Sequence, residues 1–199
     1  MNDRLEMLLE KFRALERELA MEFQKKQEEF FYQVHKKRVW FPWEIKQEHK
    51  RMVISALQYI RESRPLVLLT LPIIWACAIP ALLLDLMITI YQAICFPIYG
   101  IPKVCRGDFI ILDRHNLNYL NVIEKLNCVY CGYFNGLVGY AREMAARTEQ
   151  HWCPIKHARR VGDIHSRYKY FLDYGDGKRY RMEIETARRD FEDLKQNNS

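Results

Sequence analysis

The chain has 199 residues and a formal net charge of +6, from 31 Lys and Arg against 25 Asp and Glu, which is enough for one domain with accessory segments. Aromatic residues make up 13% of it, which excludes a chain that is disordered throughout. The positive charge is spread along the sequence rather than gathered in one dense basic tract, so we expect no nucleic-acid partner. Lys and Arg beside an apolar segment favour instead the anionic face of a membrane.

The N-terminal residues 3–38 have the pattern of a long amphipathic helix. Charged residues fill most of its faces, and apolar residues recur at alternating steps of three and four, which is the spacing of a coiled-coil seam. These seam residues are Leu5, Leu8, Phe12, Leu15 and Leu19. We expect the helix either to associate with a second copy of the chain, giving a homo-oligomer, or to pack back onto the chain's own domain.

A basic and aromatic segment follows and completes the first region, residues 1–43. It runs from His35 to Trp43, with Lys and Arg first and Trp40 and Trp43 after them. Indole rings favour the headgroup level of a bilayer, and cations meet lipid phosphates there. The second region, residues 44–64, reads as an amphipathic juxtamembrane helix that leads into the membrane.

Residues 65–101 form the third region and are apolar almost throughout. As one helix, residues 66–101 would be about 54 Å long, whereas a bilayer's hydrocarbon core is about 30 Å thick. We therefore predict a transmembrane helical hairpin that turns near residues 80–85 and leaves Asp85 facing the far-side water. Basic residues on both flanks place both termini in the cytoplasm.

Two alternatives to the hairpin stay open at this point. One is a single span with an interfacial remainder, kinked at Pro72 or Pro80. The other is a pair of buried helices in a soluble protein, which the length of the uncharged run disfavours. Asp85 would be a carboxylate buried at membrane depth only if the chain does not turn there.

The fourth region, residues 102–199, is predicted to be a small cytoplasmic helical domain. The patterns indicate helices over residues 115–127, 137–150, 164–172 and 179–195, with a turn at residues 173–177. No alternation typical of strands persists anywhere in the chain. The predicted fold class is therefore all-α.

Three cysteines and a histidine in this region have the spacing of a metal site. Cys128, Cys131, Cys153 and His157 follow the order Cys-x2-Cys-x21-Cys-x3-His, the ligand set of a tetrahedral Cys3His centre. We expect a turn at Cys128–Cys131, with Gly132 supplying backbone freedom after it. Zinc is the expected ion and iron the alternative. A redox dithiol, or no cofactor, are the competing interpretations.

Two carboxylates each lie one helical turn before a predicted ligand. Glu124 precedes Cys128, and Glu149 precedes Cys153. At these offsets they are candidates for a catalytic base or for hydrogen-bond acceptors behind the metal ligands. Exposed charges paired with neighbouring Lys or Arg are the simpler interpretation of each.

The motifs at residues 126–136 and 147–158 resemble known sequences. Cys-x-x-Cys-Gly-Tyr is similar to the metal-binding knuckle of rubredoxins, although a second such knuckle is missing from this chain. Together, LNCxYCGYxNG and RTExxWCPIKHA resemble the motifs of a family of uncharacterised bacterial membrane proteins. That resemblance covers residues 60–175 and implies a location in the bacterial inner membrane, without implying an activity.

Two functions follow as hypotheses. The first is a membrane-anchored, cytoplasm-facing metal-binding protein that acts as a binding or assembly module, with the lipid bilayer as one partner and a protein partner left unidentified. The second is a membrane-associated iron redox protein or metalloenzyme that uses the same four ligands. The sequence does not decide whether the protein is an enzyme.

Overall fold

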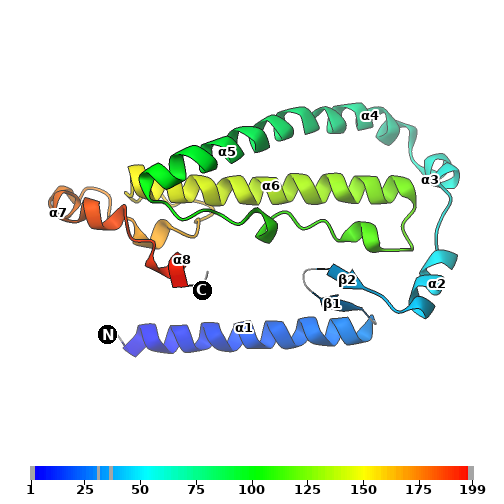
Figure 1. Ribbon diagram of the computed structural model, residues 1–199, viewed down its shortest axis with the longest axis horizontal. Coiled ribbons are helices and arrows are strands. Elements are labelled where there is room, and N and C mark those ends of the chain that lie inside the picture. Colours follow the sequence, from blue (N-terminus) through cyan, green and yellow to red (C-terminus); the bar gives the residue numbers. More distant parts are fainter. Residues whose placement is uncertain (1–2, 31, 36–37, 197–199) are drawn as a thin grey trace. The chain divides into compact units, whose positions relative to one another are not determined.

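A computed structural model describes residues 3–30, 32–35 and 38–196 of the chain, and these residues are mostly helical (Figure 1). This confirms the predicted all-α class at the level of helix content. The chain divides into two units, and each is described by itself. Unit 1 comprises Met1–Ile60 and Asp113–Lys125, and unit 2 comprises Arg61–Leu112 and Leu126–Ser199.

Unit 1 begins with helix α1, Asp3–Glu29, which is shorter than the helix predicted over residues 3–38. Strand β1, Gln33–His35, then pairs antiparallel with strand β2, Arg38–Trp40, with Val34 opposite Val39. The prediction of helix here was wrong because aromatic and β-branched residues replace the charged pattern after Glu29, and such residues favour strands.

The juxtamembrane region holds two short helices where one was predicted. Helix α2 spans Trp43–Arg51 and helix α3 spans Ala56–Glu62. The second starts after Ser55, whose hydroxyl accepts a hydrogen bond from the backbone N–H of Gln58 at 3.2 Å. This is the action of a helix N-cap, and it explains why the chain restarts rather than continues the helix.

The apolar region of unit 2 forms helix α4, Pro65–Ala76, and helix α5, Ala78–Tyr99, joined through Cys77 in a helical conformation. Residues 80–85 lie inside α5, so the predicted hairpin turn is wrong. Among the described residues, the segment Pro65–Tyr99 is the one helix long and apolar enough to cross a membrane. Asp85 belongs to this helix rather than to a turn.

Gly100 ends α5 and turns the chain back. Its φ of 67° lies in the left-handed region, which suits glycine at a helix C-terminus, and the backbone N–H of Ile101 donates to the carbonyl of Phe96 at 2.9 Å. The chain then runs back along unit 2 in a return segment, residues 101–112, which includes η1, Arg106–Asp108 (Figure 1). It enters unit 1 again with η2, Arg114–Asn116.

Helix α6, Val122–Trp152, follows the return and lies beside α5 in unit 2. Contacts join Asp85 to Tyr133 and Gln92 to Tyr140, so residue numbers rise together along both helices and the two helices run parallel. The core of unit 2 lies between these helices and the return segment. It is formed by Ala81, Phe96, Ile101, Val104, Leu137, Tyr140, Met144 and Phe191.

The chain after α6 is mainly irregular as far as helix α7, Gly177–Ala187, which is followed by α8, Glu192–Gln196. The helix predicted over residues 164–172 is reduced to η3, Tyr168–Tyr170. The backbone N–H of Leu172 donates instead to the carbonyl of Pro154 at 2.8 Å, in a parallel bridge. The turn predicted at residues 173–177 is present, with Gly175 at φ 87°.

Candidate functional site: a polar interior beside the apolar helix

The structure does not form the turn that was predicted around the first two cysteines. Cys128 and Cys131 lie within the continuous helix α6. Gly132 is buried in the same helix, so its small size serves packing rather than a turn with positive φ. The Cys-x-x-Cys-Gly sequence was therefore misinterpreted as a knuckle.

The four predicted metal ligands do not converge. Cys153 follows the last residue of α6, Trp152, so about 36 Å of helix, at a rise of about 1.5 Å per residue, separates it from Cys128. Within the part of the chain that the structure describes, no group of three or more His, Cys, Asp or Glu side chains could hold a metal ion. One ion therefore cannot contact all four side chains in this arrangement.

His157 and Cys153 lie close in sequence, but each has surroundings different from those expected of a metal ligand. Cys153 is exposed. The backbone N–H of His157 donates to the Tyr168 hydroxyl at 3.0 Å, and its ring stacks on the Tyr168 ring with centroids 6.3 Å apart. These contacts fix the loop after α6.

The two candidate catalytic carboxylates have structural roles here. Glu124 and Asn121 form a reciprocal capping box: the Asn121 side chain accepts from the backbone N–H of Glu124 at 3.0 Å, and Glu124 accepts from that of Asn121 at 2.8 Å. Glu149 lies 3.2 Å from Nε2 of His165. The first pair starts α6, and the second links α6 to the loop that follows it.

Asp85 is the functional candidate that the structure brings forward. It is 9% exposed, and both of its carboxylate oxygens accept from the Arg106 guanidinium, with Oδ2 at 2.6 Å from Nη2. The Tyr133 hydroxyl donates to Oδ2 at 2.7 Å. Arg106 from η1 thus neutralises a carboxylate on the apolar helix α5, and Tyr133 from α6 adds a hydrogen bond, so this buried charge has both a counter-ion and a donor.

Gln92 continues this polar stripe two turns further along α5. Its side chain accepts from the backbone N–H of Val104 at 2.7 Å and donates to the Val104 carbonyl at 3.3 Å. It also donates to the Tyr140 hydroxyl at 2.9 Å. The Gln92 amide therefore satisfies both the N–H and the carbonyl of Val104. Through Gln92 and Tyr140, the return segment is linked to α5 and α6.

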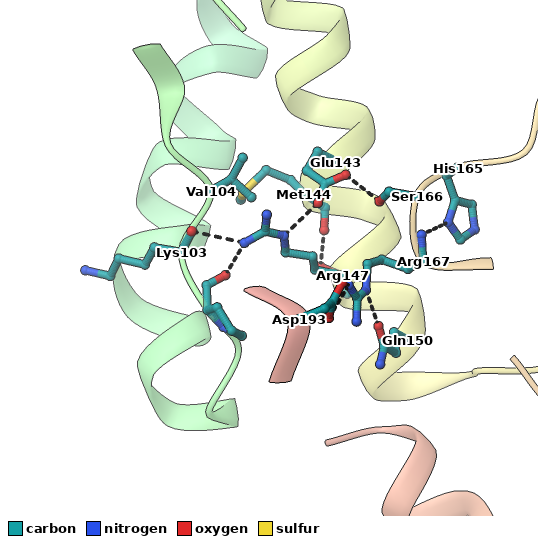
Figure 2. A network of polar contacts seen from close by, with 12 residues as sticks. Lys103, Val104, Glu143, Met144, Arg147, Gln150, His165, Ser166, Arg167 and Asp193 are labelled. Carbon is teal, nitrogen blue, oxygen red and sulfur yellow. Dashed lines mark hydrogen bonds and ion pairs between the residues drawn. The ribbon is translucent and has the colours of Figure 1, made fainter. Parts of the chain in front are cut away.

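Arg147 on α6 satisfies the two carbonyls that precede Val104. Figure 2 shows its guanidinium donating to Pro102, at 2.8 Å, and to Lys103, at 3.0 Å, while Glu143 accepts from its Nε at 2.8 Å. Side chains of α5 and α6 thus bind three consecutive residues of irregular backbone. Backbone without secondary structure is tolerated beside lipid only when its polar groups are satisfied in this way.

A second buried arginine holds the end of the chain against α6. Arg167 is 1% exposed; it donates to Gln150 at 2.5 Å and to both Asp193 oxygens, at 2.7 and 2.9 Å (Figure 2). Burial acts to raise the pKa of Asp193, but hydrogen bonds from Arg167 and Tyr170 outweigh it and hold that pKa below its ordinary value. Asp193 is therefore charged at neutral pH.

Sequence reasoning missed most of these residues. Asp85 and Gln92 lie seven residues apart, which places both on one helix face, and that spacing in an apolar helix was a usable signal. Arg106 is one of the basic residues that flank the apolar region, and no sequence pattern predicts that it or Arg147 binds an interior group. Arg167 carried no signal, because its partners lie 17 and 26 residues away in sequence.

Comparison with protein-family models, curated proteins and solved structures finds no match to this chain. The resemblance of its two cysteine motifs to a bacterial membrane-protein family therefore stays a prediction. Function has to be inferred from the geometry of the chain itself.

Proposed function

We propose that this protein is a membrane-embedded helical module, in which α4 and α5 contact lipid acyl chains and the rest of unit 2 is built against them. One observation supports this most strongly. The segment Pro65–Tyr99 has 35 residues, and its most apolar window of 18 residues has a mean hydropathy of 2.4, yet only 6% of that window is buried by protein. Core helices of soluble proteins are buried, so this helix needs another apolar environment.

The exposed apolar side chains of α4 and α5 show how much surface such an environment has to cover. Leu66, Leu69, Ile79 and Ile98 are each more than 70% exposed, and they are distributed along the whole segment. Soluble monomers rarely expose continuous apolar patches beyond a few hundred Å², and each Å² left in water forfeits about 25 cal/mol. Acyl chains are the simplest cover for a surface of this length.

The distribution of polar groups supports the same proposal. Asp85 and Gln92 face α6 and the return segment, where each has partners. The opposite face of α5 carries Leu86, Met87, Ile90 and Ile94. A helix with a satisfied polar inner stripe and an apolar outer face is suited to contact protein on one side and lipid on the other.

The length of the segment constrains how it lies in a bilayer. At about 1.5 Å per residue, 35 residues extend about 52 Å, against about 30 Å of hydrocarbon. The helix must therefore tilt strongly or lie partly along the interface. The prediction that both termini are cytoplasmic depended on a hairpin. The side of the membrane on which the chain after α5 lies can be measured by labelling the exposed Cys105 and Cys153 from each side.

The role as a binding or assembly module is inferred from α1. Leu15, Leu19 and Phe23 on this helix are 58–63% exposed, while the side chains of Leu5, Leu8 and Phe12, the rest of the predicted seam, lie outside what the structure describes. A half-apolar exposed helix suits a second helix as partner. The single-ion centre on Cys128, Cys131, Cys153 and His157 is not included in the proposal, because most of the length of α6 separates the first two residues from the last two.

Membrane fractionation of the full chain tests the proposal. We expect the protein to sediment with membranes and to resist alkaline carbonate extraction. Leu69→Lys with Ile73→Lys should weaken this association, because each Lys at the centre of a span costs about 2.5–3.5 kcal/mol. Met182→Lys is the matched control, since Met182 is 76% exposed on α7. A wild-type protein released by carbonate, or equal behaviour of both variants, would contradict the proposal.

A further inference from the structure

A cavity of about 330 Å³ in unit 1 is lined mainly by donor groups. It lies between β2, α2 and the segment around η2. Its lining includes two ammonium groups, three amides and an imidazole, and none of the lining side chains is acidic. The polar lining consists of Lys46, Lys50, Gln47, Asn116, Asn118 and His115.

The two lysines are placed to act together. Lys46 and Lys50 are four residues apart on α2, so they lie on the same helix face one turn apart. Nζ of Lys46 lies 4.7 Å from the centre of the Trp40 ring. Among the described residues, neither lysine has a carboxylate within ion-pair distance, so the positive charge of the cavity is not neutralised by protein.

A mainly apolar cavity, whose lining also includes Asp113 and Arg114, adjoins the basic one. It has a volume of about 370 Å³ and shares Val39 and Phe41 with its neighbour. The His49 ring lies against Phe41 and Tyr119, with centroids 5.3 and 5.0 Å away. A basic cavity and a mainly apolar cavity thus lie on either side of Val39 and Phe41. Such a pair of cavities suits a ligand that has both a charged head and a hydrocarbon part.

Two exposed tryptophans indicate where such a ligand comes from. Trp40 is 66% exposed and Trp43 is 68% exposed, and Trp43 also lines the basic cavity. Indole rings favour the lipid headgroup layer. A phosphate group at that level would meet the two ammonium groups and the amide donors together.

We propose that this cavity binds the phosphate of an anionic phospholipid headgroup, with Lys46 and Lys50 as its main charged contacts. The inference rests on the proposed membrane function and adds lipid selectivity to it. The two can fail separately, because membrane association is carried by α4 and α5 in unit 2, whereas headgroup selectivity is carried by unit 1.

The test measures lipid binding by the full chain in neutral detergent. Purified protein is titrated with phosphatidylglycerol or phosphatidylcholine carrying brominated acyl chains, and quenching of tryptophan fluorescence is recorded. We expect phosphatidylglycerol to bind about tenfold more tightly than phosphatidylcholine. Lys46→Ala with Lys50→Ala should abolish that preference, and Lys46→Arg with Lys50→Arg should retain it, because charge and donors are kept.

Lys25→Ala with Lys26→Ala is the matched control, since it removes the same charge from α1 of the same unit, and it should retain the preference. Equal binding of the two lipids by the wild type would overturn the proposal, as would an equal loss of preference in both alanine variants. Glycerol phosphate is added in a separate arm. If it displaces phosphatidylglycerol at equal concentration, the cavity binds a soluble phosphate ester, and the assignment to lipid is overturned.

Discussion

Arg106 Nη2 lies 2.6 Å from Asp85 Oδ2, and the other guanidinium nitrogen binds the second carboxylate oxygen. The pair joins the middle of the apolar helix to the return segment. Asp85 is almost buried, while the Arg106 side chain is 45% exposed. Removing Arg106 therefore leaves a carboxylate that water hardly reaches, whereas removing Asp85 leaves a guanidinium that is partly hydrated.

We expect Arg106→Leu to lower the free energy of unfolding by about 2 kcal/mol in detergent. This lies below the 3–5 kcal/mol of a fully buried pair because the Asp85 carboxylate keeps its hydrogen bond from the Tyr133 hydroxyl after Arg106 is removed. Asp85→Leu combined with Arg106→Leu should cost less than the two single losses added together. Thermal unfolding of the four proteins measures this coupling, and additive losses would show that the pair contributes no interaction of its own.

Gly136 lets the backbone of α6 lie close to the return segment. A Cβ placed there would lie 2.7 Å from the carbonyl oxygen of Phe109 and 2.8 Å from Cα of Ile110. Both are backbone atoms, so relief requires the segment to move. We expect Gly136→Ala to lower the melting temperature, at a cost of about 1–3 kcal/mol. Gly162→Ala, with nothing within 4 Å of its Cβ, should leave melting nearly unchanged.

The ion pair between Arg167 and Asp193 makes unit 2 sensitive to acid. The pKa of Asp193 is lower in the folded protein than in the unfolded chain, so its contribution to stability is full above the unfolded pKa of about 3.9 and is lost as pH falls further. We expect Asp193→Asn to be less stable at pH 7 and to lose less stability between pH 5 and pH 3. Melting temperature against pH, compared with wild type, measures the difference.

Separation of the predicted ligands along α6 leads to a prediction about metal. If Cys128 and Cys153 are about 36 Å apart along the helix, chelation should leave the melting temperature unchanged, and Cys153→Ser should behave like wild type. Elemental analysis of protein purified without added zinc or iron provides the direct measurement. A stoichiometric metal that Cys153→Ser removes would contradict this course of α6 and restore the Cys3His hypothesis.

Helix content and the apolar segment could be read from the sequence because both depend on local properties. Long runs of helix-forming residues and an uncharged stretch identify themselves without tertiary contacts. The hairpin turn could not be decided in this way. Pro80 and Asp85 suggested a break, but Arg106 and Tyr133 make the carboxylate compatible with a continuous helix.

The metal site failed as a prediction of geometry for a related reason. Cysteine spacing predicts a knuckle only when the chain turns between the cysteines, and Gly132 was interpreted as a turn residue. Gly132 is instead buried within α6, and Gly136 one turn later makes room for the backbone of Phe109. A glycine is equally suited to both roles, so only knowledge of the segment packed against it could distinguish them.

The parallel course of α5 and α6 affects how the protein can be made. Contacts such as that between Gln92 and Tyr140 join residues 48 positions apart, whereas Val104 and Arg106 follow Gln92 and Asp85 by only 12 and 21 positions. During synthesis, the residues that follow α5 therefore offer partners to its polar face before α6 has been made. For the membrane-embedded module proposed above, this order would keep the carboxylate and the amide paired while α6 is still on the ribosome.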